Sequence, residues 1–140
     1  MKAPKAAKLN YNEIIVGAEY QFTKKIHRQL VLDFAQLTGD YSPLHTDLEF
    51  GKTCSFRQNV VHGMLLGSLF STLVGMYCPG ERCLYISQSL NFKKPIFYED
   101  TVIVKGTVLS KTDSIQLVTM KTEIIKHSEI AINGEARIQC

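Results

Sequence analysis

Apolar residues recur at helical spacing in two segments of the chain. In the first, residues 27–38, Leu30, Phe34 and Leu37 lie three or four positions apart, which is the spacing of one face of an α-helix. Gly39 follows directly, and glycine at this position is typical of a left-handed helix cap. An amphipathic helix ending at Gly39 is therefore predicted.

The second helical segment is more apolar and covers residues 63–78, where Pro79 and Gly80 end it. Its length, roughly 22 Å at about 1.5 Å per residue, suits a buried helix. Small residues occupy every fourth position, namely Gly63, Gly67, Ser71 and Gly75. They form a stripe on one face. Since glycine destabilises a helix interior, we expect another element to approach this face closely.

The other regular segments are rich in β-branched residues and are bounded by turn-forming clusters. They cover residues 14–22, 83–92, 101–109, 115–125 and 130–138. The clearest hairpin connection is residues 111–114, whereas Asn133-Gly134 fits either a tight turn or a bulge. A helix followed by consecutive strands, without β-α-β alternation, predicts an antiparallel α+β domain whose sheet wraps around the apolar helix.

Residues 40–56 show no sustained period and are predicted to form a folded overhang rich in turns. Pro43 pushes the preceding residue toward an extended conformation. Thr46 and Glu49 have the spacing of a capping box, which predicts one short helical turn ending at Gly51.

Composition limits the chain to one domain and a few classes of protein. With 140 residues, of which 45% are hydrophobic, it can bury one sizeable core. We assign residues 1–12 to a flexible basic tail and residues 13–140 to the domain. No apolar run is long enough for a membrane span or a secretory signal. The net charge of +3 is scattered, which argues against nucleic acid.

The cysteines provide a weak indication of compartment. The four residues, at positions 54, 78, 83 and 140, show no paired C-x-x-C spacing, and a chain of this size does not need disulfide bonds to fold. A reducing compartment, the cytoplasm, is the simpler interpretation.

The densest group of potentially reactive residues is Thr38-Gly39-Asp40-Tyr41-Ser42-Pro43-Leu44-His45. A carboxylate and an imidazole, from Asp40 and His45, lie five positions apart across a proline-stiffened turn. Sharing one water, they could deprotonate it and supply a proton to an adjacent carbon. The spacing alone is a weak signal and favours the alternative that Asp40 only caps a turn and His45 is a solvated loop residue.

A second group, Asn59 to Met64, lies where the overhang enters the apolar helix. The amide of Gly63 would be an unpaired donor at the positive end of that helix, able to polarise a thioester carbonyl as an oxyanion hole does. The local alternatives are that Gly63 serves packing only and that His62 is a buried, hydrogen-bonded helix cap.

Other catalytic motifs are absent. The sequence has no H-E-x-x-H, G-x-S-x-G, Walker loop or dinucleotide fingerprint. Its four histidines and four cysteines do not form a recognisable zinc pattern, so no metal site is predicted.

Three blocks taken together, LTGDYSPLHTD, VVHGMLLGSLFS and YISQSLNFKKPIFYEDTV, resemble the (R)-specific enoyl-CoA hydratases, the MaoC-like branch of the hot-dog superfamily. They occur in the family's order and separations, and the resemblance runs from about residue 14 to the end. Ser42 departs from the pattern, because the family more often has Asn there. Both residues are turn formers.

The resemblance implies a hot-dog fold, a homodimer, and reversible syn addition of water to a trans-2-enoyl-CoA, giving an (R)-3-hydroxyacyl-CoA. It implies no metal or redox cofactor, coenzyme A being part of the substrate. Matched by position, Asp40 and His45 hold and activate the water. Gly63 offers its amide to the thioester carbonyl, and Ser71 supports the pair through a hydrogen bond.

Two alternative functions remain open, a hot-dog acyl-CoA thioesterase and a non-catalytic acyl-CoA-binding hot dog. Candidates for the coenzyme A phosphates are the basic residues Lys24, Lys25, Arg28, Arg57, Lys93 and Lys94. Candidates for an acyl tunnel between helix and sheet are Leu65, Leu69, Tyr77 and Leu84. Chain-length preference and pathway do not follow from the sequence.

Overall fold

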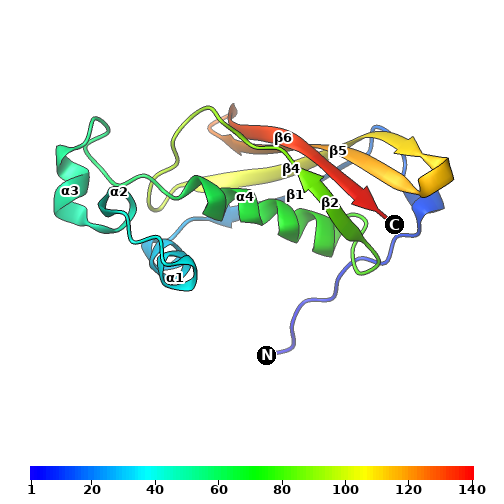
Figure 1. Ribbon diagram of the computed structural model, residues 1–140, viewed down its shortest axis with the longest axis horizontal. Coiled ribbons are helices and arrows are strands. Elements are labelled where there is room, and N and C mark those ends of the chain that lie inside the picture. The colour runs from blue at the N-terminus through cyan, green and yellow to red at the C-terminus, as the bar shows by residue number, and fades with distance from the viewer.

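The structure, a computed structural model, describes residues 1–140 and contains one antiparallel sheet. Its strands follow the order β1-β4-β5-β6-β2, with β3 also pairing with β6 (Figure 1). The strands are β1 (Glu19–Lys25), β2 (Leu84–Gln88), β3 (Asn91–Phe92), β4 (Thr101–Thr112), β5 (Leu117–Lys126) and β6 (Glu129–Gln139). The antiparallel α+β class predicted from the sequence is confirmed.

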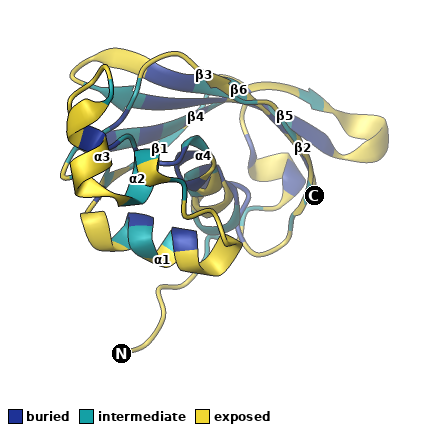
Figure 2. Ribbon diagram, turned by 60° about the vertical axis from the view of Figure 1, so that its left-hand side comes forward, coloured by how far each residue is buried: buried dark blue, intermediate teal, exposed yellow.

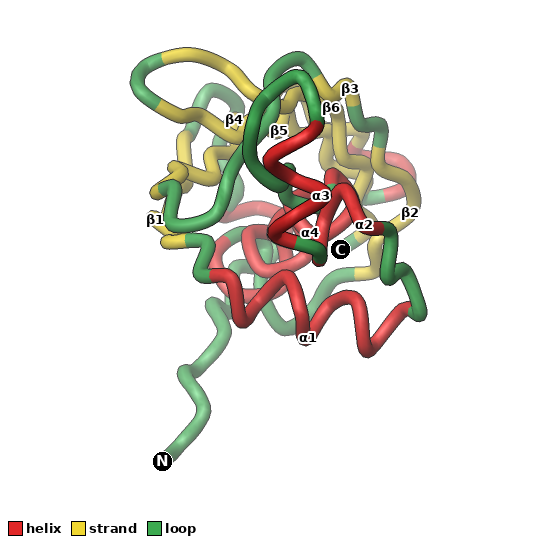
Figure 3. The backbone as a smooth tube through the Cα atoms, turned by 90° about the vertical axis from the view of Figure 1, so that its left-hand side faces the viewer, coloured by secondary structure: helices red, strands yellow, loops and turns green.

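Four α-helices complete the fold: α1 (Arg28–Thr38), α2 (Pro43–Thr46), α3 (Leu48–Thr53) and α4 (Gly63–Thr72). A π-helical turn, Leu73–Tyr77, extends α4, and short 3-10 turns cover Tyr11–Glu13 and Asp113–Ile115. The helices α1, α2 and α3 lie together at one end of the molecule, on the left in Figure 1 and toward the viewer in Figure 3. None of the helices is long and apolar enough to cross a membrane.

The core lies between α4 and the sheet. Leu66 and Phe70 of α4 join Val104, Met120 and Ile132 of the strands in one cluster of buried apolar side chains. In Figure 2 buried residues lie mainly in the strands and helices, whereas most of the loops are exposed. Alternate residues of β4 are buried, as expected for a strand with one face on a core.

The first strand begins later than the sequence predicted. Residues 15–18 form a turn in which Gly17 has a φ of +89° and donates its amide to Val108 O at 2.8 Å. Ile14 is buried, but it caps the preceding 3-10 turn and does not lie in a strand. Its side chain is apolar because it packs in the core, so the sequence pattern wrongly places Ile14 in the first strand. That strand, β1, starts at Glu19.

The long helix predicted over residues 63–78 is confirmed, with a π-helical last turn in which Cys78 N donates to Leu73 O. Its stripe of small residues is in close contact along only half its length. A Cβ at Gly63 would lie 2.6 Å from the Phe92 ring, and one at Gly67 would lie 2.8 Å from Leu90. Further along, a Cβ at Gly75 would meet no atom of another element within 4 Å, and Ser71 is exposed.

Asn133-Gly134 is neither a turn nor a bulge, because both residues pair regularly with β5 inside β6. The register irregularity lies nearer the start of the strand, opposite Ile124 and Ile125. A Cβ at Gly134 would collide with Ser89 O. Glycine is thus needed where the predicted strand 83–92 breaks into β2 and β3.

The overhang contains the predicted short helical turn, but its cap is one residue later than expected. Asp47, not Thr46, caps α3, accepting hydrogen bonds from the amides of Glu49 and Phe50. The hydroxyl of Thr46 bonds instead to main-chain oxygens of Tyr41 and Ser42.

The second half of the predicted tail is attached to the domain. Ala7 N donates to Met76 O at 2.9 Å, and Leu9 N donates to Pro79 O at 3.1 Å. Tyr11 is buried. These hydrogen bonds tie residues 7–9 to the end of the apolar helix, and the domain boundary after residue 12 stays a prediction.

Candidate active site

The C-terminus of α1 positions Asp40. Gly39, with a φ of +81°, is the left-handed cap predicted from the sequence, and its amide donates to Ala35 O. The chain then turns so that Asp40 N contacts the Thr38 hydroxyl at 3.3 Å and Ser42 N donates to Asp40 Oδ1 at 3.1 Å. The turn fixes one carboxylate oxygen and leaves the side chain about half exposed, at 51%.

The short helix α2 carries His45. Its Nδ1 lies 2.6 Å from Val60 O, so Nδ1 bears the proton and Nε2 is left for chemistry. Tyr98 donates its hydroxyl to the carbonyl oxygen of His45. Burial raises the pKa of Tyr98, which keeps this hydroxyl protonated as a donor.

His62, the N-cap residue of α4, lies between the two predicted catalytic residues. Its Nε2 is 3.0 Å from Asp40 O and 3.7 Å from Asp40 Oδ2. Its ring centroid is 4.0 Å from that of His45. The sequence indicated a buried cap at this position, but not the contact with Asp40.

Asn59 is a second residue whose role the sequence did not reveal. It is 3% exposed, and its Nδ2 donates to the carbonyl oxygens of Pro43, Leu44 and Asp47 at 2.8–3.2 Å. Pro43 and Leu44 belong to α2, and Asp47 is the residue that joins α2 to α3. Asn59 therefore holds the overhang, with His45, against the strand-like segment that leads into α4.

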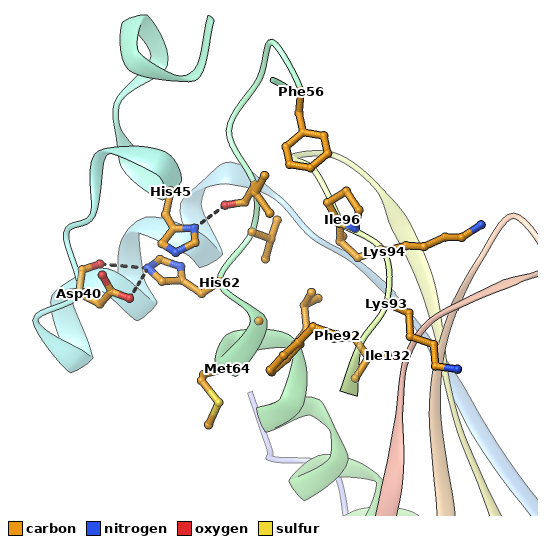
Figure 4. Close-up of a pocket in the computed structure, with 15 residues that line it drawn as sticks. Asp40, His45, Phe56, His62, Met64, Phe92, Lys93, Lys94, Ile96 and Ile132 are labelled. Carbon is orange, nitrogen blue, oxygen red and sulfur yellow. Dashed lines mark hydrogen bonds and ion pairs between the residues drawn. The ribbon is translucent and has the colours of Figure 1, made fainter. Parts of the chain in front are cut away.

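These side chains line a cavity of about 470 Å³. Its apolar lining includes Phe56, Leu66, Phe92, Ile96 and Ile132, and Asp40 is its single acidic residue. Figure 4 shows the imidazoles of His45 and His62 on one side of the cavity and the aromatic rings of Phe56 and Phe92 across it. The cavity thus places polar reactive groups beside an apolar compartment, as small-molecule sites do.

Gly63 also lines this cavity. As the first residue of α4 its amide has no acceptor within the helix, and the helix dipole favours a partially negative atom at this end. The Phe92 ring lies where a Cβ of residue 63 would be. Phe92 and Gly63 are therefore neighbours in the lining of the cavity. The structure brings together Asp40, His45 and Gly63, as the sequence predicted.

A MaoC-like domain model matches residues 12–129. The chain belongs to the MaoC-like family. It is 38% identical over 125 residues to the (R)-specific enoyl-CoA hydratase of Aeromonas caviae, covering 89% of this chain and 93% of the relative. It is 32% identical to a mitochondrial 3-hydroxyacyl-[acyl-carrier-protein] dehydratase of Arabidopsis thaliana, covering 86% and 74%.

Among solved structures, an R-hydratase from Pseudomonas aeruginosa superimposes with a TM-score of 0.92 at 30% identity, covering 96% of this chain and 87% of that one. The predicted hot-dog fold is thereby confirmed. With relatives named hydratases and dehydratases, this MaoC-like protein is a hydro-lyase.

Ser71, the fourth site residue predicted, lies away from the others within one chain. It is exposed on α4, two turns beyond Gly63, and it does not line the cavity. Its support of the catalytic pair stays a prediction for this MaoC-like protein. In a dimer with a second chain beside α4, Ser71 could lie near the catalytic pair of that chain.

The residues proposed for the acyl tunnel and the phosphates are mostly outside the cavity. None of Leu65, Leu69, Tyr77 and Leu84 lines it; Tyr77, for example, stacks on Phe22 at 5.2 Å. Of the six basic candidates, only Lys93 and Lys94 line it, and Lys94 pairs with Glu129.

Asp40, His45 and His62 each offer one possible metal-ligating atom, all within 4.8 Å of one another. Two of the imidazole nitrogens, His45 Nδ1 and His62 Nε2, face carbonyl oxygens and therefore carry protons. A metal would have to displace one of these hydrogen bonds unless it used only the remaining nitrogens.

Proposed function

We propose that this MaoC-like protein is an (R)-specific enoyl-CoA hydratase, which reversibly adds water to a trans-2-enoyl-CoA and gives an (R)-3-hydroxyacyl-CoA. The observation that carries the proposal is that Asp40, His45 and Gly63, which come from separate elements, line one cavity. The similarity to hydratases over most of the chain supports the same reaction.

In the proposed mechanism, Asp40 and His45 hold one water against the β-carbon of the enoyl thioester. Asp40 accepts a proton from this water while the water oxygen bonds to the β-carbon. On the same face, Nε2 of a protonated His45 supplies a proton to the α-carbon. The proton that Asp40 took from the water then passes to His45, which restores the starting state of the enzyme. Gly63 N donates to the thioester oxygen and stabilises the enolate-like charge between the two steps.

The anchoring of the two side chains suits these roles. Ser42 N holds Asp40 Oδ1, which leaves the other carboxylate oxygen for the water. Val60 O holds His45 Nδ1, which directs Nε2 to the reaction. Fixed donors and acceptors lower the barrier because little reorganisation is needed when charge develops.

The substrate would enter with its thioester at Gly63 and its acyl chain against the apolar wall. Lys93 and Lys94 at the other side of the cavity (Figure 4) are candidates to meet the phosphates of coenzyme A. The reaction transfers protons without net oxidation or reduction, so no redox cofactor is proposed, and coenzyme A is part of the substrate.

A homodimer is part of the proposal. The strand β2 lies at the edge of the sheet, and its Leu84 and Ile86 are 63% and 48% exposed. Pairing of two such edges would cover these side chains. Four free cysteines are compatible with a reducing compartment, and we propose the cytoplasm.

The deciding experiment mixes the purified protein with crotonyl-CoA and follows the ultraviolet absorbance of the enoyl group, with chiral analysis of the product and measurement of free thiol. Loss of absorbance with formation of the (R)-3-hydroxy product and no thiol release is expected. Release of free coenzyme A would instead identify a thioesterase. No change with short-, medium- and long-chain substrates would leave an acyl-CoA-binding protein.

The variant Asp40→Asn tests the assignment of the base. It keeps the side-chain shape and the oxygen that accepts from Ser42 N, but it cannot take a proton. We expect at least about a hundredfold loss of kcat with crotonyl-CoA binding retained, measured by calorimetry. Full activity in this variant would remove Asp40 from the mechanism.

A further inference from the structure

His62 is an unusual residue for its position in the core. Its side chain is 2% exposed, and its Nδ1 has no hydrogen-bond partner. A buried polar atom without a partner costs free energy. A phenylalanine would fill the same space beside Phe34, whose ring centroid is 5.0 Å away, without this cost. The imidazole must therefore supply something that a hydrocarbon ring cannot.

The other nitrogen of His62 makes the contact that an apolar ring would lose. Nε2 lies 3.0 Å from Asp40 O, and since a carbonyl oxygen only accepts, Nε2 must bear the proton. The same N–H is 3.7 Å from Asp40 Oδ2. His62 thus contacts both the main chain and the carboxylate of the residue that we propose as the base (Figure 4).

We propose that His62 is a positioning residue that sets the carboxylate of Asp40 and the imidazole of His45 in register with the amide of Gly63; this inference rests on the proposed hydratase function. Its Nε2–H holds Asp40, and its ring face supports His45 at 4.0 Å. The next residue in the chain is Gly63 itself. One side chain therefore links the base, the acid and the carbonyl donor.

This link matters because the groups come from separate elements. Asp40 follows α1, His45 lies on α2, and Gly63 begins α4. Small displacements of such groups reduce rates strongly, because the reacting atoms must lie in near-attack geometry. A loss of the His62 contact should therefore lower kcat and leave KM, which reflects binding in the apolar compartment, nearly unchanged.

Two substitutions separate the N–H from the ring. The variant His62→Phe keeps the ring and the packing against Phe34 but loses the N–H. The variant His62→Gln keeps an N–H donor near the place of Nε2 and loses the ring. We expect His62→Phe to lower kcat for crotonyl-CoA by about thirtyfold or more, with KM within about threefold. His62→Gln should retain at least ten times the kcat of His62→Phe.

A double-mutant cycle tests whether His62 acts through Asp40. In an Asp40→Asn background, His62→Phe should lower kcat by less than about threefold further, because the group that it positions is already inactive. A full additional loss would show that His62 acts independently of Asp40 and would overturn the proposal. Wild-type kcat in His62→Phe would overturn it as well, as would equal losses in His62→Phe and His62→Gln.

A readout independent of activity keeps this test apart from that of the proposed function. The amide of Ser42 donates to Asp40 Oδ1, so its hydrogen exchange reports how firmly Asp40 is held. We expect faster exchange in His62→Phe than in wild type or His62→Gln, whether or not the protein hydrates crotonyl-CoA. The variant Phe70→Leu, a core change on α4, is the control: it should lower the unfolding temperature without changing exchange at Ser42. Unchanged exchange in His62→Phe would overturn the proposal.

Discussion

Cys78 illustrates how the surroundings of one residue determine a property of the whole fold. The side chain is fully buried where the π-helical turn after α4 ends. Burial raises the pKa of its thiol from the ordinary value of 9.0 to about 11. The folded state therefore favours the neutral thiol, and in the unfolded chain the thiol ionises at a lower pH.

This difference predicts a loss of stability in alkali. The contribution of the neutral, buried thiol to stability is fully present below the unfolded pKa of 9.0 and is lost as the pH rises toward 11. Between pH 8.5 and 10 we expect the free energy of unfolding to fall by about 1 kcal/mol more in wild type than in Cys78→Ala. Urea unfolding at the two pH values measures it, with the buried neighbour Val74→Ala as the control for lost volume. Equal slopes in wild type and Cys78→Ala would contradict the prediction.

The same scale shows which site residues a sequence can reveal. The pair Asp40 and His45 is visible because both partners lie within one short turn. His62 and Asn59 are not, because they bond to carbonyl oxygens of residues 12 to 22 positions away. Every residue has a main-chain carbonyl, so the sequence does not show which of them accepts a given side-chain hydrogen bond. Such contacts become apparent only when the overhang and the start of α4 are placed side by side.

At the scale of elements, the overhang depends on how its two short helices are capped. Asp47 accepts from two amides of α3, whereas the Ser42 side chain makes no cap hydrogen bond to α2. Both residues are N-caps of helices too short to be stable alone. The difference in capping thus predicts a difference in the cost of removing each side chain.

Replacing Asp47 by Ala should destabilise the protein by about 1 kcal/mol, and Ser42→Ala should cost less than about 0.5 kcal/mol. Chemical denaturation measures both, and the two variants serve as each other's control. We also expect Asp47→Ala to lower kcat, because α3 packs beside the helix that carries His45. A larger cost for Ser42→Ala than for Asp47→Ala would contradict this account.

Elements with a strong period were predictable, and those shaped by tertiary packing were not. The helix ending at Gly39 and the apolar helix beginning at Gly63 follow from spacing and caps. The start of β1 was misplaced because buried Ile14 caps a 3-10 turn. The π-helical turn and the break between β2 and β3 depend on neighbours distant in sequence, such as Gly134 against Ser89.

At the scale of the whole molecule, one chain has an incomplete surface along β2. The strand has a neighbour, β6, on one side only, so one row of its backbone groups has no partner strand. Leu84 and Ile86 are both exposed on this edge strand, where a register shift falls between Tyr85 and Ser87. Ser71 of α4 is also uncovered, although the resemblance assigns it a supporting role at the site.

These features predict that the protein is a dimer joined at β2. Sedimentation at micromolar concentration should give twice the mass of one chain, 15.8 kDa. The double variant Leu84→Lys/Ile86→Lys should sediment as a monomer, because charges at the centre of an interface are costly to bury. In the matched control Leu109→Lys, an exposed leucine of β4 is replaced, and the sedimenting mass should not change.

A wild-type monomer, or a dimer that survives the double variant, would exclude pairing through β2. If the double variant is a monomer whose kcat falls while it still binds crotonyl-CoA, the second chain contributes to catalysis. Such a result would fit a supporting role for Ser71, which is exposed on α4 in one chain.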